Sequence, residues 1–358
     1  MSNEKIFDYI VVGQGLAGTL ISWFLHKNGK SFYVIDNAHF QAASNIAAGI
    51  INPITGRKYV KSWRIEQFLP FAEATYEDIA DFLSTRFAHH KLIYRGLYSI
   101  HDENTWEARK SDEIAGQYIV DDPQTSEYEG RINGILSYGV LKGGMQIQLP
   151  VIIKKYQEYL KSSALILEEK FDHSKLLLQF NSVTYKHLKA KNIIFSEGYQ
   201  AQFNPYFNYL PFEAAKGDVL IIKIKDRPFD NILRHKVFIA PIDDEHYWVG
   251  SDYRWKFEDD RPDPAKKEEL IATLDKILNA PYEIVKHIAG IRPCVKGRRP
   301  FLGRHPEYKM MSIFNGLGTK GASLGPYWAN HLINYLVKGD PLDKEVNINR
   351  FYSEKRHN

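Results

Sequence analysis

The chain has 358 residues, of which 44% are apolar and 25% are charged, a globular composition that excludes a disordered chain and a fibrous repeat. This length predicts two domains, and the net charge of +4 suits acidic small molecules without itself indicating nucleic acid. The single cysteine, Cys294, excludes an internal disulfide and a multi-cysteine metal site. No signal-peptide pattern and no apolar run of the ~20 residues that span a bilayer is present, so we expect a cytoplasmic protein without a membrane span.

The N-terminal stretch predicts a strand, a glycine-rich turn, a helix and a second strand. Residues 8–12 are mostly β-branched or aromatic and stop at a glycine, which is typical of a short buried parallel strand. The motif Gly-x-Gly-x-x-Gly fills residues 13–18, and a helix is expected over 19–27, before an Asn-Gly pair. The second strand, 32–36, ends on Asp36, which lies 18 residues after the last glycine of the motif.

Each residue of this motif has a physical role in binding a dinucleotide. Gly13 permits the tight turn, Gly15 lets the backbone approach a pyrophosphate, and Gly18 lets the helix pack closely, with its N-terminal amides facing the phosphates. Asp36 is placed to accept hydrogen bonds from the ribose hydroxyls. A glycine-rich turn that binds no nucleotide is the alternative, but the complete strand–turn–helix–strand context favours dinucleotide binding.

The next segments mix small residues, a helical pattern and strands. Residues 42–53 are small and irregular, which suits a backbone pressed against a flat cofactor and equally suits a tightly packed loop. Residues 62–87 have largely helical spacing of apolar side chains, with an interruption at Pro70. After these, 91–100 and 134–141 are predicted strands separated by a polar, charged region.

The second half of the chain predicts two helices among many strands, and then a C-terminal helix. Residues 148–162 and 263–279 have amphipathic helical patterns, 310–314 is strand-like, and 327–338 is expected to be the last helix. Short strands are expected over 165–169, 175–180, 182–185 and 192–196. A second, more aromatic group of strands predicts an antiparallel sheet in another domain, at 218–224, 236–241 and 246–253.

Seven further segments, each weak alone, follow the glycine motif in a specific order. They are 46–53 (IAAGIINP), 193–198 (IIFSEG), 215–220 (AKGDVL), 238–241 (FIAP), 249–251 (VGS), 290–293 (GIRP) and 316–321 (GLGTKG). In this order the chain resembles the FAD-dependent D-amino-acid oxidase and glycine oxidase superfamily over nearly its whole length. In places, residues 251–254 and 316–326, it is most similar to the oxidase half of the bifunctional enzyme that modifies the tRNA wobble uridine, although it lacks that enzyme's methyltransferase half.

The resemblance implies an α/β fold with a discontinuous, GR2-like Rossmann-type FAD-binding domain and an inserted α+β substrate domain built on an antiparallel sheet. The FAD-binding domain is expected over residues 1–88, 142–205 and 286–358, and the substrate domain over 89–141 and 206–285. The implied activity is oxidation of the C–N bond of an amino acid or secondary amine. Hydride passes to flavin N5, the imine is hydrolysed, and O₂ or another electron acceptor takes the electrons.

The resemblance also implies which residues bind FAD. The segment over 316–321 is expected to place backbone amides near the flavin N1–C2 edge, where negative charge develops on reduction. The full set of expected FAD contacts is Gly13, Gly15, Leu16, Ala17, Gly18, Asp36, Asn45, Ala47, Ala48, Gly49, Gly198, Arg292, Gly316, Leu317, Gly318, Thr319 and Lys320.

Four residues are candidates for the chemistry itself. Arg292, the arginine of the Gly-x-Arg-Pro motif, is expected to bind a substrate carboxylate, because a guanidinium matches it bidentately; a structural ion pair is the alternative. Lys320 adds positive charge at the N1–C2 edge, unless it is a solvated loop lysine. Phe238 stands where relatives often carry tyrosine, and Tyr253, like Tyr247, is a candidate to replace that hydroxyl or is a packed sheet aromatic.

Other charged and metal-ligating residues give weaker signals. Basic residues that are expected near the site form a solvated rim or bind extra negative charge on the substrate, and they are Arg57, Lys58, Arg254, Lys296, Arg298, Arg299 and Lys320. Cys294 is interpreted as a small buried residue. The histidines lack ligand spacing, and neighbours such as His89 and His90 cannot direct both rings at one ion from a regular element, so no metal is predicted.

Two other functions remain open from the sequence. One is a flavoenzyme that removes a carboxymethyl group from a modified tRNA wobble uridine, in which case tRNA is the partner and its affinity falls steeply with salt. The other is a flavin-binding assembly protein that keeps the fold without catalysis.

Overall fold

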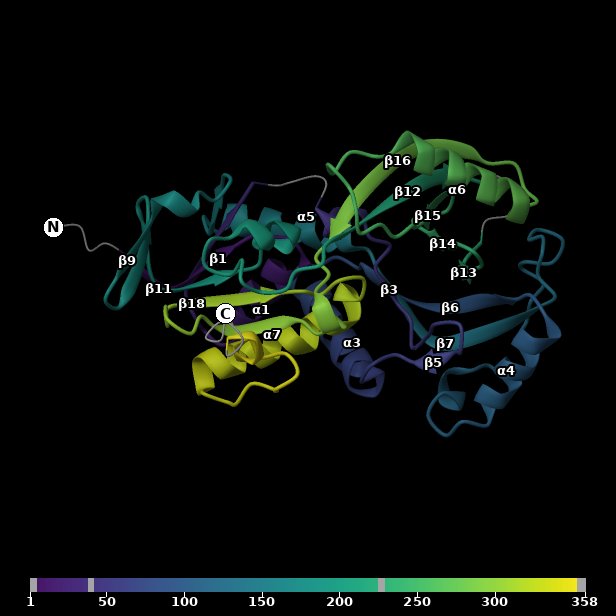
Figure 1. Cartoon of the computed structure of the whole chain (residues 1–358), viewed down its shortest axis with the longest axis horizontal. Coiled ribbons are helices and arrows are strands. Elements are labelled where there is room, and N and C mark those ends of the chain that lie inside the picture. Colours follow the sequence, from purple (N-terminus) through teal and green to yellow (C-terminus); the bar gives the residue numbers. More distant parts are fainter. Residues whose placement is uncertain (1–4, 38–41, 225–228, 353–358) are drawn as a thin grey trace.

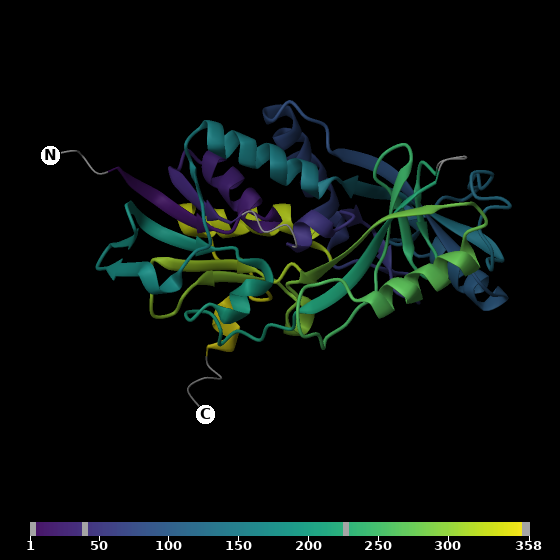
Figure 2. The same cartoon turned by 90° about the horizontal axis from the view of Figure 1, so that it is seen from above.

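The computed structural model describes residues 5–37, 42–224 and 229–352. Two eight-stranded sheets lie next to each other along the long axis of the molecule (Figures 1 and 2). A third, two-stranded sheet is formed by β4 (Ile54–Thr55) and β5 (Val60–Lys61). Of the helices in these ranges, none is both long enough and apolar enough to cross a membrane.

The first sheet has a parallel centre, as the N-terminal strand–turn–helix–strand pattern predicts. The strands β8, β2, β1, β11 and β18 run parallel in that order, β17 is antiparallel at one edge, and the β9–β10 hairpin pairs with β11. Their bounds are β1 Ile6–Val12, β2 Phe32–Asp36, β8 Ile166–Glu168, β9 Leu176–Gln179, β10 Ser182–Tyr185, β11 Leu188–Phe195, β17 Phe301–Arg304 and β18 Met311–Asn315.

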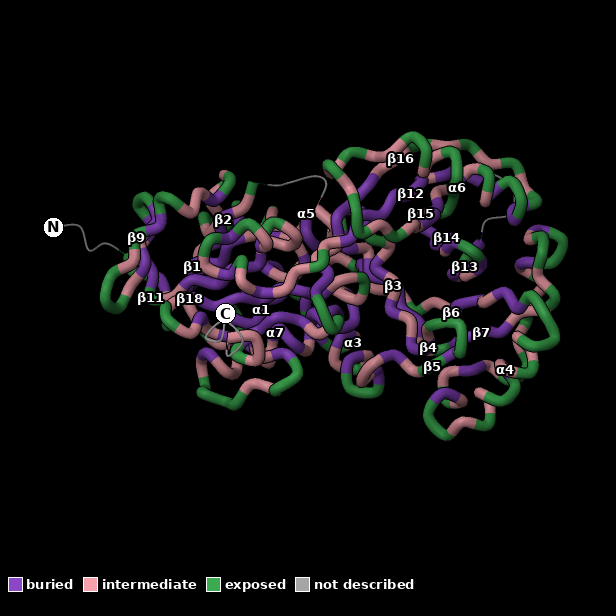
Figure 3. Tube along the Cα trace, viewed as in Figure 1, coloured by how far each residue is buried: buried purple, intermediate pink, exposed green. Residues whose placement is uncertain are grey.

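Both faces of this sheet are buried (Figure 3). Val11 contributes to a core shared with four helices, whereas Ile10 and Val12 face a second core rich in aromatic side chains. The helices of the first core are α1 (Leu16–Lys27), α3 (Ile65–Phe82), α5 (Leu149–Ser162) and α7 (Gly321–Lys338). Burial on both faces explains why the central strands lack an apolar–polar alternation.

The second sheet is almost wholly antiparallel, as the aromatic, alternating strand signals predict. Its order is β16-β12-β15-β14-β13-β6-β7-β3, and β13 with β6 is its one parallel pair among the described strands. The bounds are β3 Ile50–Ile51, β6 Ala88–Leu97, β7 Ser137–Ile147, β12 Ala215–Lys223, β13 Ile232–Arg234, β14 Phe238–Pro241, β15 His246–Gly250 and β16 Glu283–Arg292.

Helices cover this sheet on its two faces. Helix α6 (Pro264–Ile277) packs on one face with Leu270 and Leu274. Helix α4 (Ile100–Lys110) contributes Trp106 to the small core on the other face. Short elements complete the chain: α2 Ala43–Ile46, η1 Gly116–Tyr118, η2 His173–Lys175, η3 Gly198–Phe203, η4 Lys296–Arg298 and η5 Ile348–Phe351.

The sheets do not follow the predicted division of the chain segment by segment. The boundary predicted between residues 141 and 142 falls within β7, and the one between 285 and 286 falls within β16. Both strands belong to the second sheet, and so does β3, which comes from the first predicted segment. The division into the two predicted domains stays a prediction.

Several helices differ from their prediction in where they begin, in their continuity or in having been missed. Helix α1 begins at Leu16, three residues earlier than expected, and α7 begins at Gly321 instead of residue 327. Helix α4 was not predicted, because among its residues Trp106 alone is buried and the remainder has no apolar stripe. Pro70, expected to interrupt a helix, lies inside the continuous α3.

Candidate functional site

A cavity of about 780 Å³ opens where the first sheet, the start of α7 and one face of the second sheet meet. The glycine-rich turn after β1 and the segment around 42–52 line it from the side of the first sheet. From the second sheet it receives Gly217, Val219, Phe238, Trp248, Gly250 and Arg292. Trp248 also ties these two parts together, because its indole Nε1 donates a hydrogen bond of 2.7 Å to the Ile46 carbonyl.

The glycine-rich turn is shaped by backbone contacts that leave no room for side chains. Gly13 has φ +94°, and a Cβ there would lie 2.5 Å from the Ser196 carbonyl oxygen. A Cβ on Gly18 would lie 1.7 Å from the Gly13 oxygen, so α1 can start directly behind the turn. The Gln14 amide donates to Asp36 Oδ1 at 2.8 Å, which fixes that carboxylate at the cavity wall.

The N-termini of two long helices face the same cavity. Gly15 is the N-cap of α1 and Lys320 that of α7, and neither of these residues caps its helix through its own side chain, although Ser44 Oγ accepts from the Leu16 amide at 3.1 Å. The positive ends of both helix dipoles therefore favour negative charge there. Burial, together with the charges of Arg298 and Arg299, lowers the pKa of Lys320, whose ammonium donates to Ser62 Oγ at 3.2 Å.

These features fit FAD. The glycine turn at the N-terminus of α1 suits a pyrophosphate, and the N-terminus of α7 suits a flavin that gains negative charge. Three predicted FAD contacts lie outside the cavity lining, namely Gly18 beneath the turn, Asn45 in α2 and Gly316 at the end of β18. The others line it: Gly13, Gly15, Leu16, Ala17, Asp36, Ala47, Ala48, Gly49, Gly198, Arg292, Leu317, Gly318, Thr319 and Lys320. Their roles as FAD contacts remain predictions.

Arg292 lies at the end of β16 with its guanidinium over Gly217. A Cβ on Gly217 would come within 2.1 Å of Nη2, so the missing side chain makes the space that Arg292 fills. Nη2 donates to Ser251 Oγ and, at 3.2 Å, to the Asp252 carbonyl. Nη1 is buried without a partner, and burial lowers the pKa of Arg292. Within the described ranges Arg292 forms no ion pair. The alternative that Arg292 is a structural arginine held by a carboxylate therefore finds no support among these residues.

The aromatic candidates differ in position. Phe238 and Tyr253 line the cavity, and the Tyr253 ring lies 5.2 Å from the Arg292 guanidinium. Tyr253 Oη contacts Cys294 Sγ at 3.1 Å, and burial raises the pKa of both groups; Cys294 is buried, as predicted. Tyr247 instead points into the core, where its hydroxyl accepts from the Phe229 amide, so of its two alternatives the packed sheet aromatic is the one that fits.

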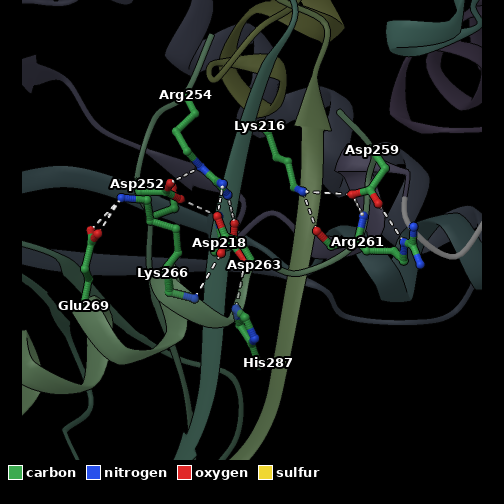
Figure 4. Close-up of polar contacts among 12 residues, drawn as sticks. Lys216, Asp218, Asp252, Arg254, Asp259, Arg261, Asp263, Lys266, Glu269 and His287 are labelled. Atoms are coloured by element: carbon green, nitrogen blue, oxygen red, sulfur yellow. Dashed lines mark hydrogen bonds and ion pairs between the residues drawn. The ribbon is translucent and has the colours of Figure 1, made fainter. Parts of the chain in front are cut away.

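A buried charge network (Figure 4) includes Asp252, whose carbonyl accepts from Arg292. Asp218, which is fully buried, accepts from the Arg254 guanidinium, from His287 Nε2 at 2.8 Å and from the Asp263 amide at 2.8 Å. Arg254 also pairs with Asp252 at 2.6 Å and with Asp263 at 2.7 Å. This network fixes the loop that presents Ser251 and the Asp252 carbonyl to Arg292.

The network corrects the prediction that Arg254 belongs to a basic rim. Its three aspartate partners neutralise it, and it does not line the cavity. Of the seven basic residues expected near the site, Lys320 lines the cavity; Arg57, Lys58, Lys296, Arg298 and Arg299 do not.

Sequence reasoning missed three cations that do line the cavity: Lys170 after β8, Arg234 on β13 and Lys236 in the turn that follows β13. The signal for Arg234 and Lys236 was weak, because β13 has three residues and was not predicted as a strand. The alternation Arg234, Lys236, Phe238 across the hairpin turn was the pattern that could have revealed these two.

Within residues 5–37, 42–224 and 229–352, no group of three or more His, Cys, Asp or Glu side chains is placed to hold a metal ion.

Comparisons with known proteins agree with this geometry. Residues 8–334 match the family model of the FAD dependent oxidoreductases (DAO). The chain is 22% identical over 371 residues to the glycine oxidase of Bacillus subtilis (strain 168), covering 96% of this chain and 95% of that protein.

Two solved structures show the same fold. The glycine oxidase of Bacillus cereus ATCC 14579 superposes with a TM-score of 0.78 at 15% identity, covering 94% of this chain and 96% of that one. The iminodiacetate oxidase of Chelativorans sp. BNC1 superposes with a TM-score of 0.75 at 18% identity, covering 96% and 98%. The family model spans most of the chain, and the glycine turn after β1 suits a dinucleotide. This protein therefore belongs to the family of FAD-dependent oxidoreductases, with FAD as its cofactor.

Proposed function

We propose that this protein oxidises the C–N bond of an amino acid or secondary amine to an imine, which water then hydrolyses. The observation that carries the proposal is the unpartnered, buried Nη1 of Arg292 at the cavity wall, since a buried guanidinium N–H without an acceptor is costly and a substrate carboxylate would supply one. The glycine oxidase and iminodiacetate oxidase relatives, whose names state carboxylate-bearing amines, support the same substrate class.

The chemistry that FAD would supply when bound is an acceptor for the hydride of the C–H bond beside the amine. The protein's part is to hold the substrate and exclude water. Arg292 binds the carboxylate through the N–H groups that Ser251 and Asp252 leave available. Phe238 and Trp248 give an apolar wall, and Lys320 with the N-terminus of α7 stabilises negative charge at the far side of the cavity.

The remaining expectations complete the proposal. O₂ or another electron acceptor takes the electrons, and the second sheet forms most of the substrate-binding part. The tRNA alternative stays a prediction.

The test is an anaerobic titration of the purified yellow protein with D- and L-amino acids, glycine, N-methylglycine and iminodiacetate, followed at the flavin absorbance band. We expect at least one amine to bleach the band. Arg292→Ala removes two or more charged hydrogen bonds, each worth about 1.5–3 kcal/mol, and so should lower kcat/KM by about 100-fold or more while FAD content is unchanged.

The matched control is Arg261→Ala, which removes an arginine whose side chain is 80% exposed and lies outside the cavity. It should leave kcat/KM unchanged. A yellow protein that no amine in the panel bleaches, or an Arg292→Ala variant as active as the wild type, would contradict the proposal.

A further inference from the structure

One row of paired residues crosses the second sheet through the cavity wall. Gly250 pairs with Phe238, Phe238 with Arg234, and Arg234 with Arg95 in the registers of β15, β14, β13 and β6. Directly opposed residues share a face of a sheet. Gly250, Phe238 and Arg234 accordingly all line the cavity, so Arg234 lies on the same wall as the substrate site.

Arg234 is a desolvated cation without a counter-ion. Within residues 5–37, 42–224 and 229–352 it forms no ion pair, and its Nη1 donates to the adjacent His235 carbonyl. Its guanidinium lies 4.8 Å from the centre of the Phe238 ring. Burial lowers the pKa of Arg234, and the like charge of Arg95 adds to this effect. A cation held in this way gains much more from an arriving anion than an exposed one does.

The neighbouring cations are satisfied differently. Arg95 donates to the Gly56 carbonyl at 2.8 Å and lies 4.5 Å from the Tyr59 ring centre. Lys236 is exposed and so keeps its water. Arg234 is therefore the cation of this group that combines burial, a place in the cavity wall and no acidic partner among the described residues.

The spacing between Arg234 and Arg292 suits a substrate held at both ends. The Arg292 guanidinium lies over Gly217 on β12. The row of Arg234 meets β12 at Val219, two residues from Gly217, and β12 and β13 are three strand spacings apart, so the Gly217 and Arg234 backbones are separated by about 16 Å. The Arg234 guanidinium reaches back over Phe238, which shortens this span, so a small diacid such as a five-carbon one has the shape to contact both arginines across Phe238.

We propose that Arg234 is a specificity-determining residue that binds a second carboxylate of the substrate, so that this protein selects dicarboxylic amines over monocarboxylic ones. This inference rests on the proposed function, in which Arg292 holds the first carboxylate. Phe238 contributes the ring face that orients Arg234, a role that needs no hydroxyl.

The experiment compares two non-oxidisable carboxylates of equal length, glutarate and pentanoate, which differ in the second carboxylate. Each is titrated into the FAD-loaded protein at one salt concentration, and binding is read from the perturbed flavin spectrum. We expect glutarate to bind at least tenfold more tightly than pentanoate. Arg234→Met, which keeps the stem over Phe238, should abolish this preference and change pentanoate binding less than twofold.

Equal affinity of the wild type for the two acids would overturn the inference, as would an Arg234→Met variant that weakens both acids equally. Arg234→Gln, which keeps donor groups without the charge, gives a second reading if the Met variant does not fold; it should also lose the preference, and retaining it would overturn the inference. Arg261→Met is the matched control and should bind like the wild type.

The role of Arg292 is tested separately in the same titration. Arg292→Met should weaken glutarate and pentanoate alike. A different result is that Arg292→Met weakens neither acid while Arg234→Met still removes the preference for glutarate. That result would contradict the proposal that Arg292 binds the first carboxylate, and it would leave the proposal that Arg234 binds a carboxylate intact.

Discussion

Arg292 owes its position to residues on three different strands and loops. Gly217 on β12 leaves the space for its guanidinium, Ser251 and the Asp252 carbonyl hold Nη2, and β16 fixes its backbone. The Gly-x-Arg-Pro motif was enough to predict the arginine. The sequence could not show that the glycine that makes room for this guanidinium, Gly217, comes 75 residues earlier in the chain. Their proximity depends on the pairing of β12 with β16, in which Gly217 lies opposite Gly290.

Asp218 is the residue on which the support of Arg292 depends most. Asp218→Asn removes the buried charge between Arg254 and His287, and breaking a buried pair in this way costs about 3–5 kcal/mol. We therefore expect a large fall in the urea midpoint of unfolding. Asp78→Asn is the matched control: its side chain is 54% exposed and pairs with Lys27 at the surface, so it should cost less than about 1 kcal/mol. Equal midpoints for the two variants would contradict this ranking.

Charge was the property that the sequence predicted least well. Arg254 looked like part of a basic rim because its acidic partners, Asp218 and Asp263, are distant in sequence or belong to other elements. Arg234 went unnoticed because its strand has three residues. Whether a cation faces solvent, a carboxylate or a substrate depends on tertiary packing, which one sequence does not display.

At the scale of elements, α7 shows why a helix start was misplaced by six residues. Residues 321–326 (GASLGP) include two glycines and a proline, the residues least favourable in a helix, and Pro326 cannot donate to the Ala322 carbonyl. In the structure the Tyr76 hydroxyl of α3 donates to that carbonyl at 2.9 Å. Gly325 also lets α7 approach α1 closely, since a Cβ there would lie 2.7 Å from Leu20 Cδ1. Contacts from two other helices thus override local propensity.

Tyr76→Phe tests this replacement of a backbone hydrogen bond. It leaves the buried Ala322 carbonyl without a donor, so we expect a loss of about 1–3 kcal/mol in the free energy of unfolding. In a Pro326→Ala background the new N–H can serve the same carbonyl, and the same Tyr76→Phe change should cost distinctly less. A double-mutant cycle by urea unfolding measures the coupling. Costs that add independently would show that the two groups do not share the carbonyl.

Elements with a strong local signal were predicted well, and those without one were not. The β1–α1–β2 unit has buried strands, glycines and an Asn-Gly stop within one segment, and it formed with small shifts of its ends. Helix α4 has one buried residue, Trp106, and its Ser99 N-cap was the signal that was overlooked.

At the scale of the whole molecule, the cavity is shared between the two large sheets. A ligand that fills it contacts both, and binding to the folded state alone adds RT ln(1 + [L]/Kd) to stability. FAD at 100 times its Kd should therefore stabilise the protein by about 2.7 kcal/mol. Removing FAD should lower Tm, and titrating it back should raise Tm with FAD concentration.

The matched control for this titration is Gly13→Ala. Its Cβ would lie 2.5 Å from the Ser196 oxygen, and φ +94° strains it further, so the cradle closes. This variant should show a Tm that added FAD does not change. A wild-type Tm that is independent of FAD would contradict the placement of the cofactor between the sheets.

The cavity joins Gly15 and Lys320, which lie 305 residues apart in the chain. The glycine turn therefore has no facing wall until α7 has been translated and packed against it. We expect the complete FAD site to form only after that step, and chains that have not bound FAD to be less stable than loaded ones, so that flavin supply affects how long this protein persists.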